Sequence, residues 1–419
     1  MLNKKILHNA IWMISEKAIS IIGLFLVTSY VAKYVGPETF GIIALATATF
    51  QIVQIIAQLG NDNIIFKRVS KNNRSGIKLI KSTFLIRTII YITITIPLLI
   101  YFYSYKNNLT FIFSIAISVA CYFSSIDVYS IYNNAILKSK QNTISNMVGL
   151  TLGLSIQFII AYKKYNPIYL SIPIIITTFL PFLIRFILFN KMNLVKEIVV
   201  KKKSRYNKYI LSSGLAIVFS SLSIAIYTRI NQFMISYLDS DYSLGIYSVA
   251  VTLSSSWAFI LSALISSTLP SIFGEKDDNK AIRIGVKLNI IITLISLLVL
   301  SFITLFGKLF INLLFGEEYI NAYYLLKILC ISTMFSNLGM LSSRFIVRSS
   351  GYSFLSKKMF IMVLLSIPIS YCLIKNYGLI GASYSVLIIE FVSLTLMNYF
   401  FKKRIVWKLH LETLKMNLK

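Results

Sequence analysis

The feature that most constrains this chain is a series of long apolar runs separated by short polar or basic segments. A membrane-spanning helix needs about 20 mostly apolar residues, and twelve runs of this kind occur. They lack the period-two alternation of a membrane barrel, which favours helices. We therefore expect an all-α polytopic membrane protein. The predicted spans are 9–33, 40–66, 79–103, 109–136, 143–162, 167–189, 209–238, 243–272, 286–306, 320–346, 357–374 and 379–401.

The composition is typical of a chain that lies mainly in lipid. Hydrophobic residues make up 57% of the 419 residues and charged residues only 13%, whereas a soluble domain carries about 25% charged residues. So few charges cannot cover the surfaces of soluble domains of this total length. This excludes a soluble enzyme, a secreted disulfide scaffold and a disordered tail protein. The first run has no small-residue cleavage pattern, so we expect a transmembrane helix there rather than a signal peptide.

Basic residues cluster in alternate connecting segments, and this alternation predicts the topology. The net charge is +28, a value often associated with nucleic-acid binding, but here the charges lie between apolar runs. Segments on one side of the predicted membrane carry 30 Lys and Arg residues, and those on the other side carry 6. Because Lys and Arg accumulate in cytoplasmic loops, we expect both termini in the cytoplasm and no nucleic-acid partner.

The longest basic connection, 190–208, divides the predicted spans into six and six. We expect an N-terminal lobe with its basic linker over residues 1–200 and a C-terminal lobe with its basic tail over residues 201–419. Two similar segments, Phe40–Ala46 and Leu244–Ala250, open the second and eighth spans at an offset of 204 residues. Repeats with an even number of spans share one orientation, so two such lobes can enclose a central cavity and rock about it.

Motifs for enzymatic or cofactor chemistry are missing from the sequence. It contains no GxxxxGK[ST] phosphate loop, no GxGxxG fingerprint and no GxSxG nucleophile elbow. Cys121, Cys330 and Cys372 are scattered through apolar runs, and His8 and His410 lie near opposite ends. This spacing fits neither a disulfide framework nor a metal site. We expect no enzyme activity, no cofactor and no metal.

Apart from lysines at span ends, which count with the connecting segments, ten ionisable residues lie within the predicted spans, where each costs about 3 kcal/mol to insert. Such residues usually face a bundle interior or a hydrated cavity. The candidate cations for holding an anionic ligand are Arg229, Arg87, Lys17 and Arg344. The candidate acids for ion coupling or ion pairing are Glu16, Asp127, Glu390 and Asp62. Four residues lie near span ends, where they could snorkel to the interface: Arg185, Lys327, Arg344 and Asp62.

These charges allow two interpretations, which the sequence leaves open. In one, the deeper residues form structural ion pairs between helices, for example Arg87 with Asp127. In the other, the cations line a lumen that binds an anionic head group while the lobes alternate, and the acids carry protons or sodium ions. Arginine suits phosphate because its planar fork donates two parallel hydrogen bonds and keeps its charge.

Uncharged polar side chains also extend along the spans. Gln51, Gln54 and Gln58 are spaced by three and four residues, which places them on one helix face. A polar stripe on a membrane helix predicts a hydrated path, and Asn231 and Gln232 are candidates for the same polar cavity face.

Several short motifs, taken together, resemble one family of bacterial transporters. They run in family order across nearly the whole chain: Trp12, Glu16–Lys17, Tyr34–Gly41, Leu59–Asp62, Arg68, Tyr227–Gln232, Gly245–Ala250, Gly316–Tyr319 and Tyr377–Ala382. The pattern is similar to that of the flippases (Wzx-type) for O-antigen and capsular polysaccharide repeat units. These belong to the multidrug/oligosaccharidyl-lipid/polysaccharide (MOP) exporter superfamily. The family often has an acid where this chain has Asn231, so a coupling role at that position is in doubt.

The resemblance implies two six-helix lobes around a cationic cavity, in the inner (cytoplasmic) membrane of a bacterium. It implies a substrate of undecaprenyl diphosphate carrying a short oligosaccharide, destined for O-antigen, lipopolysaccharide or another surface polysaccharide. It also implies coupling to protons or sodium ions, and a polysaccharide polymerase with its chain-length regulator as partners. On this basis we expect a flippase that works by alternating access.

Two other functions remain open at this point. A drug antiporter of the same superfamily that binds cations should have a negatively charged lumen, whereas the predicted spans contain six cations and four acids. A polysaccharide polymerase or glycosyltransferase usually needs a sizeable external loop with catalytic acids. Here Glu317–Glu318 is the one candidate pair in a short loop.

Overall fold

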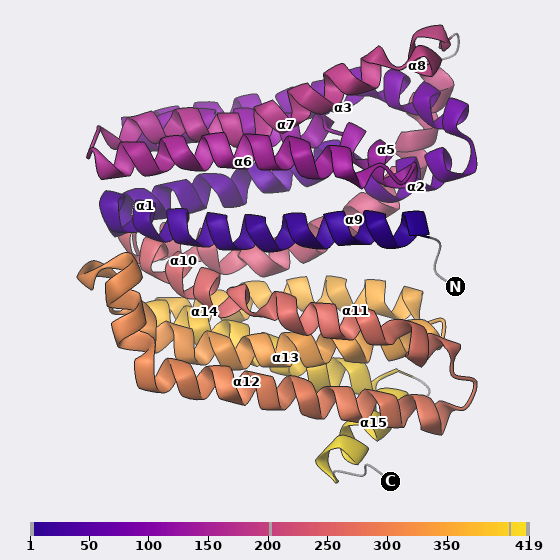
Figure 1. Ribbon diagram of the computed structural model, residues 1–419. Helices are drawn as coiled ribbons and strands as arrows, with labels where there is room; N and C mark the ends of the chain where they lie inside the picture. The colour runs from indigo at the N-terminus through magenta and orange to yellow at the C-terminus, as the bar shows by residue number, and fades with distance from the viewer. Residues whose placement is uncertain (1–3, 201–202, 402–403, 416–419) are drawn as a thin grey trace. The chain divides into compact units, whose positions relative to one another are not determined.

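The computed structural model describes residues 4–200, 203–401 and 404–415, and the regular elements within these ranges are all helices (Figure 1). Nine helical segments of this described part are long and apolar enough to cross a membrane. A bent pair, Lys203–Leu215 with Ile217–Leu238, raises the number to ten. The prediction of an all-α polytopic membrane protein is therefore confirmed.

Two of these ten segments each contain two spans, because a glycine breaks the helix between them. Gly36 (φ 76°) interrupts α1 (Lys4–Gln58), and Gly378 (φ 56°) interrupts α14 (Tyr352–Val392). Glycine adopts such positive-φ conformations without the steric cost that a Cβ atom would impose. Pro37 follows Gly36 at the start of the second helix, a position where its missing N–H has no helical partner to lose. Counting these breaks gives twelve spans in the described chain, as expected.

By packing, the chain divides into two compact units, Met1–Ala225 and Ile226–Lys419, and the boundary falls inside α9 (Lys203–Leu238). The remaining helices before α9 are α2 (Asn61–Lys71), α3 (Asn73–Tyr105), α4 (Asn108–Ile126), α5 (Tyr129–Ala135), α6 (Ser139–Tyr162), η1 (Pro167–Leu170), α7 (Ser171–Lys191) and α8 (Asn193–Glu197). The boundary expected after residue 200 stays a prediction.

In the first unit, α6 and α7 pack side by side (Figure 1), while α7 also contacts α4 and α6 also contacts α1. Gly149 and Gly153, four residues apart on α6, permit this close approach. A Cβ atom at Gly149 would lie 2.4 Å from the Pro181 ring, and one at Gly153 would lie 2.3 Å from Thr177 Cγ2. Small residues at this spacing let membrane helices approach closely, where no hydrophobic effect drives their association.

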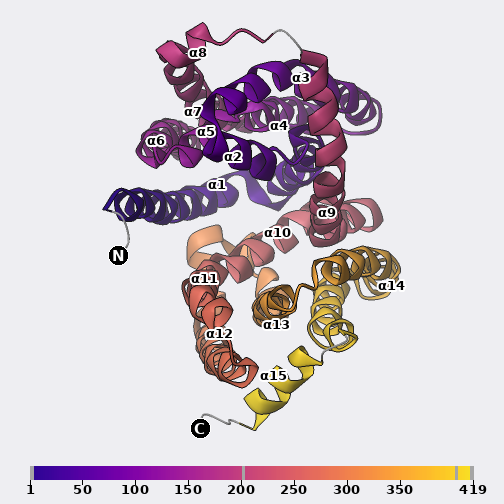
Figure 2. The same ribbon diagram turned by 90° about the vertical axis from the view of Figure 1, so that its right-hand side faces the viewer.

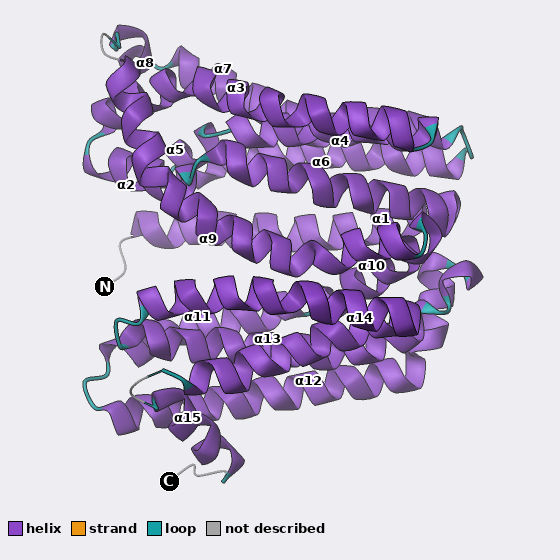
Figure 3. Cartoon of the chain, turned by 180° about the vertical axis from the view of Figure 1, so that it is seen from behind, coloured by secondary structure: helices purple, strands orange, loops and turns teal. Residues whose placement is uncertain are grey.

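The second unit contains α10 (Asp241–Ser256), α11 (Ala258–Gly274), α12 (Asp278–Phe315), η2 (Glu317–Tyr319), α13 (Ala322–Arg348), α14, the π-helical turn η3 (Ser393–Met397) and α15 (Ile405–Leu414). The short helix α15 is too short to span a membrane and packs against α12 and α13 (Figure 2). Its apolar side, Val406 and Leu409, joins a core with Phe345 of α13. Short loops connect the helices of the described chain (Figure 3).

Candidate functional site

An ion pair in the first unit joins the break between α4 and α5 to α7. The helix α4 ends at Ile126, and Asp127 has a non-helical backbone (φ −77°, ψ 68°) before α5 begins. Arg185 of α7 donates from Nε to Asp127 Oδ2 at 2.9 Å, and its Nη2 contacts the same oxygen. Its Nη1 donates to Asn146 Oδ1 of α6 at 2.6 Å. Both charged side chains are buried, with exposures of 6% and 8%.

The other carboxylate oxygen of Asp127 is available for a ligand. Oδ1 is buried and has no hydrogen-bond partner among the described residues. Asp127 also lines a cavity of about 160 Å³ with Gln58, Ser124, Ser125 and Ser130. A polar cavity of this size has room for an ordered water molecule. The carboxylate, amide and hydroxyl oxygens that line it are also the kind of atom that binds hard cations. This cavity brings together two predicted site residues, Asp127 and Gln58.

Arg87 lies in the packed interior of the first unit and is bound to its own helix, α3. Its side chain is 0% exposed. It donates from Nε to Thr83 O at 3.1 Å, and from Nη2 to Thr83 Oγ1 at 3.1 Å and to Ile80 O at 3.4 Å. The ion pair considered between Arg87 and Asp127 is therefore wrong, since the partner of Asp127 is Arg185. Whether Arg87 holds an anion stays a prediction.

A second buried polar group lies in the second unit around Glu390 of α14. Its carboxylate accepts a hydrogen bond of 2.6 Å from the Tyr227 hydroxyl of α9, and it interacts electrostatically with Lys358. Lys358 is 4% exposed and donates to Asn398 Oδ1 at 2.8 Å. The π-helical turn η3 lies between Glu390 and Asn398, and such turns are frequent at functional sites.

Two interior charges of these groups, Arg185 and Lys358, were not among the predicted site residues. Arg185 lies near a predicted span end, where snorkelling to the interface was one of two interpretations, and Lys358 counts as a loop charge in the topology analysis. A signal that could have found Lys358 is its position inside the predicted span 357–374, where the apolar residues Met359 and Phe360 follow it directly. For Arg185 the sequence carries no comparable signal, because its partners lie 58 and 39 residues away.

Asn231 serves packing between α9 and α14. It is 5% exposed, accepts a hydrogen bond from Ser385 Oγ at 3.0 Å and donates to Ala382 O at 3.4 Å. Its amide is thus used by the neighbouring helix, while the adjacent Gln232 has a buried Oε1 without a hydrogen-bond partner among the described residues. A place for both on a polar cavity face stays a prediction.

The structure places the other predicted site residues apart from these groups. Arg229 is partly buried on α9 and Arg344 is partly buried on α13, where its Nε has no hydrogen-bond partner within the described chain. Gln51 and Gln54 are partly buried on α1. The side chains of Glu16, Lys17 and Asp62 lie outside the part of the chain that the structure describes.

Solved structures of similar fold include two transporters. A multidrug resistance MATE family transporter of the MOP superfamily in an inward-facing conformation matches with a TM-score of 0.72 and 17% identity, over 92% of this chain and 95% of that one. The lipid II flippase MurJ in an inward closed conformation matches with a TM-score of 0.70 and 15% identity, over 98% and 91%. The chain thus has the fold of the MOP superfamily, a class of polytopic membrane proteins.

Sequence comparison identifies the family within this class. The family model "Polysaccharide biosynthesis protein" matches residues 6–275, and the chain belongs to that family. A capsular polysaccharide biosynthesis protein, CapF of Staphylococcus aureus, is 28% identical over 206 residues. That match covers 46% of this chain, and the chain spans about half (50%) of the length of that relative. The resemblance to polysaccharide repeat-unit flippases is therefore confirmed.

Proposed function

We propose that the protein is a flippase that moves an undecaprenyl-diphosphate-linked oligosaccharide repeat unit across a bacterial cytoplasmic membrane. The observation that carries the proposal is the occurrence of the MOP fold in a member of the polysaccharide biosynthesis family. MurJ, a flippase for lipid II, has a similar fold. The name of the S. aureus relative favours capsular polysaccharide as the product, and the O-antigen of lipopolysaccharide is the other candidate.

In the proposed mechanism, the two six-span halves alternate access to the two leaflets. Arg229, Arg87, Lys17 and Arg344 bind the diphosphate or acidic sugars, because arginine and lysine are the side chains that hold phosphate. The sugar hydroxyls bond to a polar face that includes Gln51, Gln54, Gln58, Asn231 and Gln232. The partners that supply and consume the substrate include a polysaccharide polymerase and its chain-length regulator.

We further propose that acids couple transport to protons or sodium ions. Asp127 supports this role best, because one of its oxygens has no partner in the described chain while it lines a polar cavity. Glu390 is the second candidate, since it lies between a tyrosine hydroxyl and a lysine. The remaining coupling candidates are Glu16 and Asp62.

A deletion strain tests the proposed transport step. Without this protein, we expect loss of the surface polymer and accumulation of intact, single lipid-linked repeat units on the cytoplasmic side. Wild-type protein should restore the polymer, Arg229→Ala and Arg344→Ala should restore less, and Lys163→Gln, which changes an exposed cation in a connecting segment, should restore it fully. Single repeat units at the outer surface of the deletion strain would contradict the proposal and favour a polymerase.

A drug antiporter is the second candidate, because a multidrug resistance transporter has a similar fold. Expression in a drug-sensitised host distinguishes the two functions. Increased drug resistance together with normal surface polysaccharide in the deletion strain would favour the antiporter over the flippase.

A further inference from the structure

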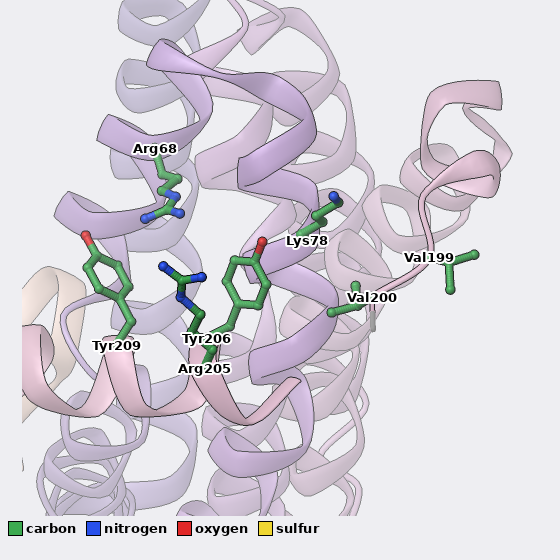
Figure 4. Close-up of a pocket in the computed structure, with 7 residues that line it drawn as sticks. All are labelled: Arg68, Lys78, Val199, Val200, Arg205, Tyr206 and Tyr209. Atoms are coloured by element: carbon green, nitrogen blue, oxygen red, sulfur yellow. The ribbon is translucent and has the colours of Figure 1, made fainter. Parts of the chain in front are cut away.

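A basic cavity lies at one end of the first unit, where α2 and α3 meet the start of α9. Its volume is about 560 Å³. Three cations line it, Arg68 of α2, Lys78 of α3 and Arg205 of α9, together with Tyr206 and Tyr209 (Figure 4). None of these residues belongs to the predicted substrate site.

A second cavity of about 590 Å³ shares Arg68 and Tyr209 with the first. It adds Lys67, Lys71 and the polar side chain of Ser75. No Asp or Glu occurs among the described residues that line either cavity. The two cavities therefore place four further cations around Arg68, with no carboxylate among their described lining residues to neutralise them, which is the electrostatic environment that an anion requires.

The side chain of Arg68 is held in place at the wall of both cavities. Its Nε donates to Ser75 Oγ at 2.9 Å, and its guanidinium lies over the Tyr209 ring at 5.0 Å and near the Tyr206 ring at 6.0 Å. Figure 4 shows the guanidinium groups of Arg68 and Arg205 directed toward each other between these two tyrosines. Two like charges that face each other repel, and an anion between them would convert this repulsion into attraction.

The far wall of the first cavity is apolar and is tethered to α3. Val199 and Val200 form this wall. Directly before them, Lys81 of α3 donates from Nζ to Val195 O at 2.6 Å and to Ile198 O at 3.0 Å. This tether holds the backbone directly before Val199 against α3.

The depth of the cavity in the membrane follows from its position at helix ends. Arg68 lies in the last turn of α2, Lys78 in the first turns of α3 and Arg205 in the first turn of α9. The ends of spanning helices lie at the lipid head-group level, where Lys and Arg contact phosphate. Cations at this depth beside an apolar wall suit a ligand with a phosphate group and an apolar part.

We propose that this cavity is a binding site for a phosphate-bearing anion, separate from the transport site. Arg68, Lys78 and Arg205 bind the phosphate oxygens, and the hydroxyls of Tyr206 and Tyr209 donate further hydrogen bonds. The ligand is either the head group of an anionic lipid or a free diphosphate. The site does not depend on the proposed transport function, because binding can be measured without transport.

Binding to the purified full-length protein in detergent tests the site, with three probes in isothermal titration. They are dioctanoyl phosphatidylglycerol, inorganic pyrophosphate and, as a control without phosphate, dioctanoylglycerol. We expect saturable binding of one or both phosphate probes and none of dioctanoylglycerol. Since each Lys or Arg near a phosphate contributes about a fivefold factor in affinity, Lys78→Gln and Arg205→Gln should each weaken binding about fivefold.

Two further variants control for folding and for general charge. Arg68→Gln also removes the hydrogen bond to Ser75 Oγ, so weaker binding in this variant would not separate lost phosphate contact from altered structure. The test therefore uses Lys78→Gln and Arg205→Gln, because the proposed role of both side chains is phosphate binding. Arg74→Gln removes an exposed cation of α3 that lines neither cavity and should leave binding unchanged.

The outcomes separate the two sources of phosphate. Binding of phosphatidylglycerol alone identifies a lipid head group, and binding of pyrophosphate identifies the phosphate group as sufficient. Absence of saturable binding by both phosphate probes, or equal binding by wild type, Lys78→Gln and Arg205→Gln, would overturn the proposal. Neither result bears on export of the polysaccharide, which the deletion strain measures.

Discussion

At the scale of single residues, charges inside the membrane helices are stabilised by direct partners within their own unit. Arg185 binds Asp127 and Asn146, while Lys358 binds Asn398. Taking such groups out of water costs several kcal/mol per ion, and only close partners offset that cost. The stability of these spans therefore depends on both members of each pair.

Removing one member of the Asp127–Arg185 pair should strongly destabilise the protein. We expect Arg185→Gln to lower the free energy of unfolding by about 3–5 kcal/mol, because it leaves a buried, uncompensated carboxylate. The double variant Asp127→Asn with Arg185→Gln should recover part of this loss. Thermal unfolding in detergent measures both effects.

A pair on the surface provides the matched control. Arg348 contacts Asp278, whose side chain is 70% exposed. We expect Asp278→Asn to change the free energy of unfolding by less than about 1 kcal/mol, as for other exposed pairs. If Asp278→Asn and Arg185→Gln lowered the free energy of unfolding equally, burial would not explain the effect of the Asp127–Arg185 pair.

The sequence predicts which residues of the spans carry charge but not how they pair. Depth along a span places Asp127 in the membrane, yet its partner Arg185 is 58 residues away and near a span end. Whether Asp127 pairs with Arg87 or with Arg185 depends on the helix break at Asp127, because its carboxylate there meets Arg185 of α7. Such a break depends on packing against neighbouring helices, which a single sequence does not encode locally.

At the scale of helices, the spans were predictable because hydropathy is a local property, and short polar segments mark the breaks near Gly36 and Gly378 in the sequence. The helix-to-helix contacts were less predictable. Gly149 and Gly153 have the spacing of a packing motif in the sequence, but their contact with α7 appears only in the fold.

A larger side chain at the contact of α6 with α7 should separate these helices. Because a Cβ atom at Gly153 would already lie 2.3 Å from Thr177, we expect Gly153→Val to cost about 1–3 kcal/mol of stability. Gly339 of α13 has no atom within 4 Å of such a Cβ position. Gly339→Ala should therefore be neutral or stabilise the helix by up to about 1 kcal/mol, and thermal unfolding compares the two variants.

The docking of α15 should depend on pH. His410 of this helix contacts Ser342 Oγ at 3.0 Å and the Tyr399 hydroxyl at 2.9 Å. Burial lowers the pKa of His410 to about 4 from its ordinary value of 6.5. Below pH 6.5 the undocked helix therefore binds a proton that the docked helix does not, so the docked state is fully stable above pH 6.5 and loses stability as the pH falls toward 4.

Hydrogen exchange of Ile405–Leu414, corrected for intrinsic rates, measures this effect. The equilibrium for opening of α15 should increase by up to about tenfold per pH unit between pH 6.5 and 4, as expected for uptake of one proton. In His410→Gln, which cannot titrate, the opening equilibrium should vary much less with pH. The same pH dependence in both proteins would rule out His410 as its cause.

At the scale of the whole molecule, the distribution of charge among the connecting segments predicts the orientation in the membrane. The 30 to 6 division of Lys and Arg residues predicts that the basic cavity around Arg68 lies on the same side of the membrane as both termini. Composition and charge alternation are properties of the whole chain. The class of protein and its membrane topology can therefore be predicted from the sequence, whereas individual ion pairs cannot.

Cysteine labelling in intact cells tests the orientation. In a variant without Cys121, Cys330 and Cys372, we expect a membrane-impermeant maleimide to label Asn166→Cys, between η1 and α6, and not Lys138→Cys, between α5 and α6. Permeabilised cells should show labelling at both positions. Labelling of Lys138→Cys in intact cells would reverse the predicted topology.

The tether from Lys81 to the segment after α8 has a consequence for biosynthesis. It joins residues that are 114 and 117 positions apart, and all of these residues precede α9 in the chain. The ribosome has therefore completed every part of this contact before it begins the second unit. Chains fold domain by domain from the N-terminus during synthesis, so the first unit can close its basic cavity while the remaining spans are still to be inserted.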